Sequence, residues 1–136
     1  MKRSGLTALI VDDEPLITTI LSRLLAKENF SQVDVANDEY SALELILSKK
    51  YDFLILDPFD KYDTIPNISD SLNVTSPYGP RILKRARELG QTPKVIAMSG
   101  MDDFEKFWEE NKPDYFLNKP FKFEKVKEII RKEFPE

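Results

Sequence analysis

The sequence contains neither cysteine nor histidine. Without cysteine the chain forms no disulfide and offers no thiolate to a metal ion, which fits a reducing compartment. Without histidine it has no imidazole for acid–base chemistry or metal binding, and no internal site for a phosphohistidine. Thiol and imidazole chemistry are therefore excluded as functions of this sequence.

Long apolar runs and clusters of positive charge are also missing. The first apolar run, Leu6 to Val11, is too short for a signal sequence or a membrane-spanning helix. A net charge of −4 provides no basic surface for nucleic acid or for an anionic membrane. We expect a cytoplasmic protein that binds neither directly, and its 136 residues suit one domain spanning 1–136.

Short apolar runs alternate along the chain with segments of helical periodicity. Strands are expected at Leu6 to Val11, Gln32 to Ala36, Phe53 to Leu56, Lys94 to Met98 and Asp114 to Leu117. Helices are expected to begin near Pro15, Asn37 or Asp38, Tyr78, Asp102 or Asp103, and Phe121. This alternation predicts an α/β fold, with a parallel sheet, helices on both of its faces and right-handed crossovers.

Within the helices, the periodicity assigns one apolar face to the core. That face is expected to include Leu16, Tyr40, Leu47 and Leu89. The stretch from Pro58 to Pro77 has no lasting period and is rich in Asp, Asn, Ser and Pro. At about twenty residues it exceeds the roughly two to six usual for a loop after a strand. We expect an enlarged irregular loop there. It is compatible with a segment that shields a nearby site, contacts a partner or brings Asp60 or Asp63 near a metal ion, and equally with an inserted segment that has no such role.

Polar side chains follow four of the predicted strands. They are Asp12 and Asp13 after the first strand, Asp57 after the third, Ser99 after the fourth and Lys119 after the fifth. Since the carboxyl ends of parallel strands share one edge, these side chains are expected to meet where such folds bind ligands. Clustered carboxylates repel unless a cation joins them, and hard oxygen ligands suit Mg²⁺. A carboxylate can also be a nucleophile toward a phosphoryl group.

Each of these residues has a common structural explanation when taken alone. The acids from Asp12 to Glu14 are typical of a helix cap, Asp57 of a turn, and Lys119 of a solvated surface. Their joint placement at the ends of the correct strands favours a functional site.

Four motifs resemble the response-regulator receiver domain of two-component signalling. They are L-I-V-D-D-E at Leu9 to Glu14, F-L-I-L-D at Phe53 to Asp57, V-I-A-M-S-G at Val95 to Gly100, and D-Y-F-L-N-K-P-F at Asp114 to Phe121. The resemblance covers nearly the whole chain. It implies a CheY-like, flavodoxin-like fold: a doubly wound, five-stranded parallel sheet in the order 2-1-3-4-5.

The resemblance also implies a role for each matching residue. Asp57 would be the phosphorylated aspartate, and Mg²⁺ would be bound directly by Asp13 and Asp57, through water by Asp12, and by the backbone carbonyl of Phe59. The phosphoryl group would be contacted by Lys119, Ser99, Gly100 and Phe59. Ser99 and Phe116 would be the switch pair.

The implied partners are a histidine kinase or phosphotransfer protein as phosphoryl donor and a downstream protein or effector domain as target. On this reading the protein is a phosphoacceptor rather than a dedicated enzyme.

Two alternatives remain. One is a binding-only pseudo-receiver whose site is blocked by the long loop. The other is a phosphatase with an aspartate nucleophile, similar to haloacid dehalogenases. That class needs a second Asp two residues after the first, where this chain has Phe59, so the phosphatase is the weaker alternative.

Overall fold

The structure, a computed structural model of the chain, describes residues 5–57, 78–99, 108 and 111–136, with Ser99 described by its backbone only. Its elements are β1 (Thr7–Val11), α1 (Pro15–Lys27), β2 (Gln32–Ala36), α2 (Glu39–Ser48), β3 (Phe53–Leu56), α3 (Tyr78–Glu88), β4 (Lys94–Ser99), β5 (Tyr115–Asn118) and α4 (Phe123–Glu133). The expected loop at Pro58 to Pro77 and the helix expected near Asp102 or Asp103 lie outside the described residues.

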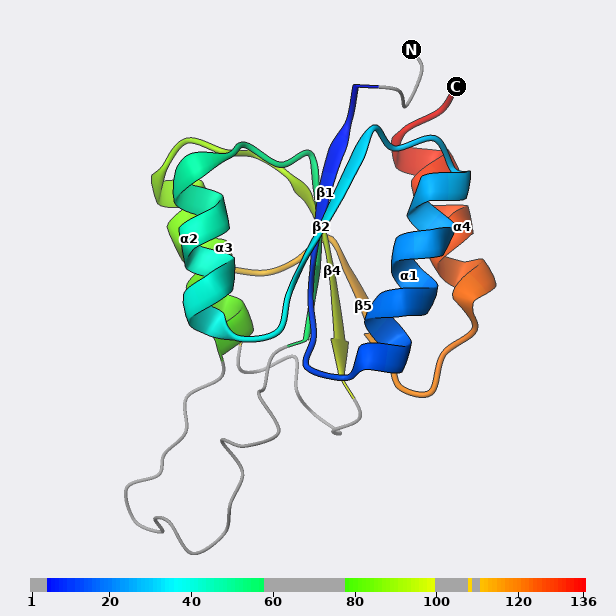
Figure 1. The fold of residues 1–136 in the computed structure, drawn as a ribbon, viewed down its shortest axis with the longest axis horizontal. Coiled ribbons are helices and arrows are strands. Elements are labelled where there is room, and N and C mark those ends of the chain that lie inside the picture. Colours follow the sequence, from blue (N-terminus) through cyan, green and yellow to red (C-terminus); the bar gives the residue numbers. More distant parts are fainter. Residues whose placement is uncertain (1–4, 58–77, 100–107, 109–110) are drawn as a thin grey trace, which may run out of the picture.

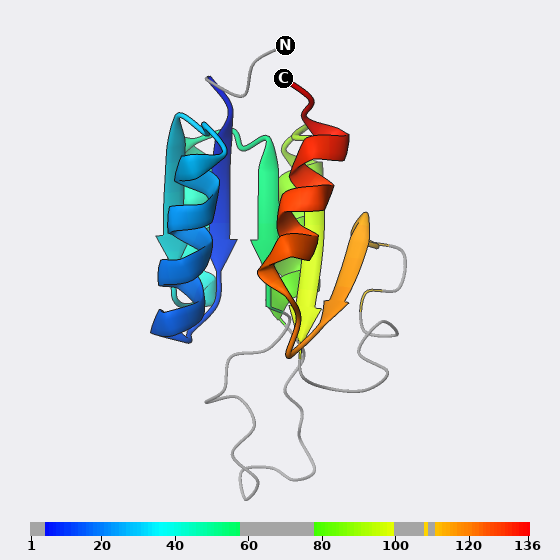
Figure 2. The same cartoon turned by 90° about the vertical axis from the view of Figure 1, so that its right-hand side faces the viewer.

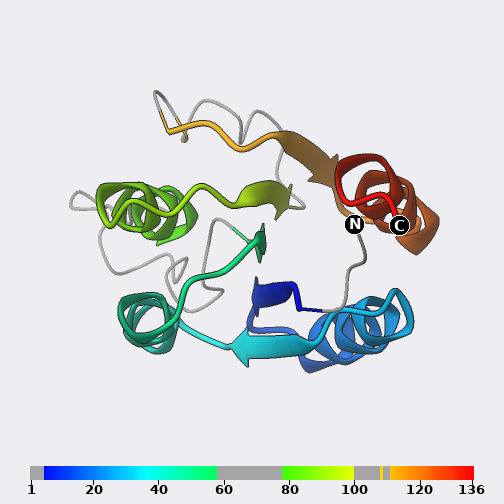
Figure 3. The same ribbon diagram turned by 90° about the horizontal axis from the view of Figure 1, so that it is seen from above.

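The five strands form one parallel sheet in the order β2-β1-β3-β4-β5. All five arrows point the same way in Figure 2, so the carboxyl ends of the strands share one edge. Helices α2 and α3 cover one face of the sheet, and α1 and α4 cover the other (Figures 1 and 3). The predicted fold class and strand order are confirmed. Among the described helices, none has the length and apolar character that a bilayer crossing requires.

The central strand β3 is formed by an unbroken apolar run of the sequence. All four of its residues are buried, because helices cover both faces of the sheet. Leu54 and Leu56 belong to the cluster that packs under α2 and α3. Phe53 and Ile55 belong to the cluster under α1 and α4. The strand therefore holds the two halves of the core together, and it fixes the position of Asp57 at its end.

Four helix residues that were expected in the core are exposed instead. Their exposed fractions are 70% for Leu16, 71% for Tyr40, 60% for Leu47 and 41% for Leu89. On α2 the buried residues are Ala42 and Ile46, one turn apart. Because each residue advances a helix by about 100°, Tyr40 and Leu47 lie outside the narrow buried stripe that Ala42 and Ile46 form. Leu16 lies in the first turn of α1, and Leu89 directly follows the end of α3. The prediction was wrong at these positions because it made the apolar faces too wide.

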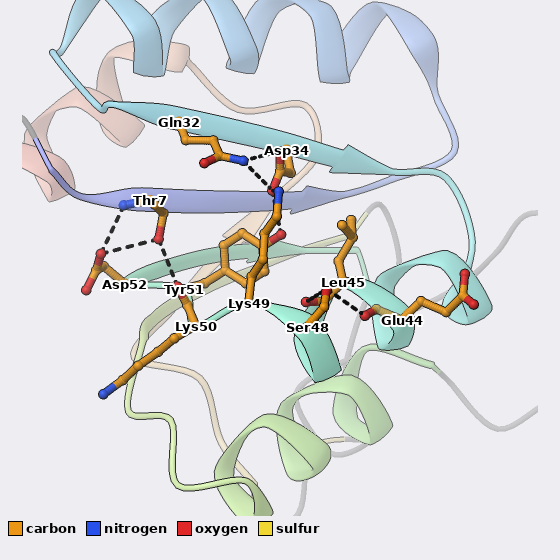
Figure 4. Close-up of polar contacts among 10 residues, drawn as sticks. All are labelled: Thr7, Gln32, Asp34, Glu44, Leu45, Ser48, Lys49, Lys50, Tyr51 and Asp52. Carbon is orange, nitrogen blue, oxygen red and sulfur yellow. Dashed lines mark hydrogen bonds and ion pairs between the residues drawn. The ribbon is translucent and has the colours of Figure 1, made fainter.

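A polar network joins the edge strand β2 to the start of β3 (Figure 4). The Tyr51 hydroxyl donates to Asp34 Oδ2 at 2.5 Å, and Lys49 Nζ lies 3.0 Å from the same oxygen. Burial acts to raise the pKa of Asp34, but the hydrogen bonds from Tyr51, Lys49 and Gln32 outweigh it and hold the pKa below its usual value. This ionised carboxylate therefore contributes to stability.

Replacing Tyr51 by phenylalanine should lower the free energy of unfolding by about 1.5–3 kcal/mol, the range for a hydrogen bond to a charged group. Because the folded pKa of Asp34 is depressed, the contribution is complete above its unfolded pKa and disappears as the pH falls through the folded value. Urea unfolding at a series of pH values should show the difference from wild type shrinking in acid.

The exposed Tyr40 offers a matched control, since Tyr40→Phe should change stability little at any pH. A Tyr51→Phe effect that did not vary with pH would contradict the role given to the Asp34 carboxylate.

Candidate functional site

The candidate site lies at the carboxyl edge of the sheet. Asp12 directly follows β1 and Asp57 directly follows β3. The ladder extends one residue further in each case, because Asp12 N donates to Ala36 O at 3.2 Å and Asp57 N donates to Val11 O at 2.9 Å. The sheet therefore holds the backbone of both acids, and since β1 and β3 are neighbours, the two side chains stand beside each other.

Three carboxylates converge at this edge. Asp12, Asp13 and Asp57 each offer an oxygen atom, and these atoms lie within 4.8 Å of one another. Asp12 is fully buried and Asp57 is 8% exposed, whereas Asp13 is half-buried. Three hard oxygen ligands in this spacing fit Mg²⁺, which favours carboxylates and keeps several waters. The acidic cluster is thus chemically suited to the ion that the resemblance implies.

Lys119, directly after β5, supplies a positive charge to the cluster. Its Nζ donates to Glu14 Oε1 at 2.6 Å, to Asp12 Oδ2 at 3.0 Å and to Asp57 Oδ2 at 3.3 Å. Burial acts to lower the pKa of Lys119, but the charge of Asp57, the hydrogen bond to Glu14 and the charge of Asp12 outweigh it and hold the pKa well above its usual value. The side chain is only 17% exposed. Lys119 is therefore a charged member of the site rather than a solvated surface lysine.

Asp12 is the carboxylate of the cluster whose ionised form is disfavoured by burial. Burial raises its pKa, and the hydrogen bond from the backbone of Glu14 and the charge of Lys119 offset the effect only in part. The Glu14 N–H donates to Asp12 Oδ1 at 2.9 Å, which fixes the orientation of the carboxylate. A fully buried carboxylate with a raised pKa gains from any further positive charge in its vicinity.

The other predicted site residues are described only in part. Ser99 ends β4 and pairs with Asn118, the residue before Lys119, so its backbone reaches the same edge of the sheet. Its side chain, Phe59 and Gly100 lie outside the described residues. Phe116 is half-buried on β5, and its ring packs edge-on against Trp108 with centroids 6.4 Å apart.

The contact between Glu14 and Lys119 was not predicted from the sequence. The acids from Asp12 to Glu14 are typical of a helix cap, and Glu14 is indeed the N-cap residue of α1. Its side chain, however, makes no capping hydrogen bond and contacts Lys119 instead. The only sequence signal was an acidic residue directly after the Asp pair, and nothing local connects it to a lysine so far along the chain.

The doubly wound parallel sheet, with three acids and a lysine at its carboxyl edge, places this protein among the α/β proteins that bind ligands where their strands end. Comparison with protein families identifies the family within this class, because residues 8–131 match the model described as the response regulator receiver domain. The chain belongs to the response-regulator receiver family of two-component systems.

Curated relatives and solved structures agree with this assignment. The chain is 31% identical over 126 residues to the sensory transduction protein LytR of Staphylococcus haemolyticus, covering 91% of this chain and 43% of that protein. It is 31% identical to the response regulator ArlR of the same species, covering 90% of this chain and 50% of that protein. The chain thus spans about half the length of these relatives.

Among solved structures, the response regulator TrrA from Thermotoga maritima in complex with Mg(2+)-BeF has a TM-score of 0.67. It is 27% identical, and the match covers 97% of this chain and 98% of that one. A receiver domain from Methanospirillum hungatei reaches a TM-score of 0.72 at 22% identity, covering 94% of this chain and 92% of that one. The second likeness supports the fold alone.

Proposed function

We propose that this protein is a phosphoryl-accepting receiver in which Asp57 is the acceptor. The observation that carries the proposal is the convergence of Asp12, Asp13, Asp57 and Lys119 at one edge of the sheet. A carboxylate at the end of a buried strand is held in place by its backbone, and the nearby ammonium can stabilise charge on an incoming phosphate. Both features favour nucleophilic attack by Asp57.

In the proposed reaction, a carboxylate oxygen of Asp57 forms a bond to phosphorus. The bond between phosphorus and the imidazole nitrogen of a donor phosphohistidine breaks, and its electron pair stays on that nitrogen. Lys119 donates a hydrogen bond to a phosphoryl oxygen, and the Ser99 hydroxyl and the backbone N–H groups of Phe59 and Gly100 hold the others. The protein assists its own phosphorylation and dephosphorylation, and we do not regard it as a dedicated enzyme.

Mg²⁺ would be held by Asp13 and Asp57 directly, by Asp12 through water, and by the backbone carbonyl of Phe59. When bound, it neutralises negative charge on the acids and on the phosphoryl oxygens. The spacing of the carboxylates supports this part of the proposal. The Mg(2+)-BeF complex of the Thermotoga maritima relative supports it as well.

The output of the proposed switch is a change in a protein-binding surface. Phosphorylation adds charge and acceptor oxygens at Asp57, Ser99 moves to bind them, and Phe116 repacks on β5. The donor would be a histidine kinase or phosphotransfer protein, and the target a downstream protein or effector domain. The greater length of the curated relatives is consistent with an effector domain as target.

Intact mass spectrometry after incubation with acetyl phosphate tests the proposal. We expect one phosphoryl group to be added in the presence of Mg²⁺ and not in its absence, and we expect Asp57→Asn to gain none. Failure of the wild type to gain mass would favour a binding-only pseudo-receiver. A gain that persisted in Asp57→Asn would place the acceptor elsewhere.

A further inference from the structure

The ammonium group of Lys119 has no donor to spare. A lysine ammonium carries three N–H donors, and Nζ of Lys119 contacts three carboxylates, those of Asp12, Glu14 and Asp57. The shortest contact, at 2.6 Å, is to Glu14, and the longest, at 3.3 Å, is to Asp57. Of the three carboxylates, that of Glu14 therefore lies nearest to the ammonium and that of the proposed phosphoryl acceptor lies farthest from it.

Glu14 is held in a position that favours this contact. It is the N-cap residue of α1, Pro15 follows it in the first turn, and its side chain makes no capping hydrogen bond. Its backbone N–H is bound to Asp12 Oδ1, so the main chain at Glu14 is fixed on both sides. The carboxylate is left to contact Lys119, and at 50% exposure it can return to water at little cost.

Glu14 differs in role from the other two partners of Lys119. Asp12 and Asp57 belong to the acidic cluster that fits a metal ion, and Asp57 is the proposed acceptor. Glu14 is outside that cluster, yet its carboxylate binds the same ammonium that a phosphoryl oxygen on Asp57 would require. The Glu14 carboxylate and a phosphoryl group on Asp57 therefore compete for the position of this one ammonium.

We infer that Glu14 is a positioning residue that holds Lys119 in the unphosphorylated protein and competes with the phosphoryl group for it. Breaking the Glu14–Lys119 ion pair is then part of the free-energy cost of phosphorylation. Removing the charge of Glu14 should lower that cost without removing any group that binds the phosphoryl oxygens or the metal ion. Glu14 thus biases the site toward its unphosphorylated state.

The variant Glu14→Gln tests this inference, because glutamine keeps the size of the side chain and loses its charge. Beryllofluoride, a mimic of the phosphoryl group, would be titrated at saturating Mg²⁺ and followed by amide NMR. We expect Glu14→Gln to bind it about two- to fivefold more tightly than wild type, the range for an ion pair with an exposed partner. Glu14→Ala, which also removes the acceptor oxygen, should bind at least as tightly as Glu14→Gln.

Two controls separate the electrostatic role from a general effect. Glu44→Gln removes the same charge from an exposed position on α2 and should leave the affinity unchanged. Because salt partly screens an ion pair with one exposed partner, the ratio of affinities between Glu14→Gln and wild type should decrease as the ionic strength rises. A ratio that did not vary with salt would show that the substitution acts through structure and would overturn the inference.

Because this inference rests on the proposed function, its failure must be distinguishable from failure of that function. If wild type does not bind beryllofluoride, the receiver chemistry itself is wrong. If wild type binds it, and both Glu14 variants bind equally or more weakly, the receiver chemistry stands and the role of Glu14 is wrong.

Discussion

Mg²⁺ should raise the free energy of unfolding of this protein by about 2.7 kcal/mol at a free concentration of a hundred times its Kd. The reason lies in the cluster of Asp12, Asp13 and Asp57, whose oxygens approach within 4.8 Å only in the folded chain. The unfolded chain does not hold these acids together, so the ion binds the folded state preferentially. Burial raises the pKa of Asp12, and a positive charge beside this carboxylate opposes that effect.

Urea unfolding followed by circular dichroism, at constant ionic strength, measures the gain. Asp13→Asn removes one of the proposed direct ligands and should lose most of the stabilisation. Glu44→Gln changes the net charge equally on an exposed part of α2 and should keep it. Equal stabilisation of wild type and Asp13→Asn would mean that Mg²⁺ acts elsewhere on the protein.

Replacing Gln91 by leucine should lower the free energy of unfolding by about 2–6 kcal/mol, because two buried backbone groups, the Tyr51 N–H and the Ile46 carbonyl, would each lose a partner at roughly 1–3 kcal/mol. Gln91 is only 6% exposed. Its Oε1 accepts from Tyr51 N at 3.1 Å, and its Nε2 donates to the carbonyls of Ile46 at 3.0 Å and Lys49 at 3.1 Å. One side chain thus joins the loop after α3 to the end of α2 and the start of β3.

Leucine fills nearly the same volume as glutamine, so the loss would come from unpaired backbone groups rather than from a cavity. The exposed Gln32 on the edge strand gives a matched control, and Gln32→Leu should change stability far less. Chemical denaturation of both variants measures the difference. If the two substitutions cost the same, the backbone groups around Gln91 find other partners.

The sequence was most informative where a local pattern and the sheet topology act together. Asp12, Asp57 and Lys119 could be placed at one site because each directly follows a short apolar run. Parallel strands bring such positions to a common edge whatever the details of packing. The fold class and the acidic cluster were therefore predictable from the order of the elements.

Contacts between distant side chains were not predictable in this way. The ion pair of Glu14 with Lys119 joins residues 105 positions apart, and the bonds of Gln91 cross 40 or more. The spacing of apolar residues along the chain does not predict such pairs, because they depend on the direction of single side chains in the assembled fold. The exposure of Tyr40 and Leu47 has a similar cause, since the width of a buried stripe depends on how closely α2 approaches its neighbours.

The contact between Trp108 and Phe116 provides this protein with an optical reporter of its own. Trp108 is the single tryptophan of the chain. It is 1% exposed, and its ring meets that of Phe116 at 76°. Indole emission responds to neighbouring rings and to water, so repacking of Phe116 would change the fluorescence of the unlabelled protein. In the proposed switch, the arrival of a phosphoryl group at one end of the sheet would therefore change the fluorescence emitted beside β5.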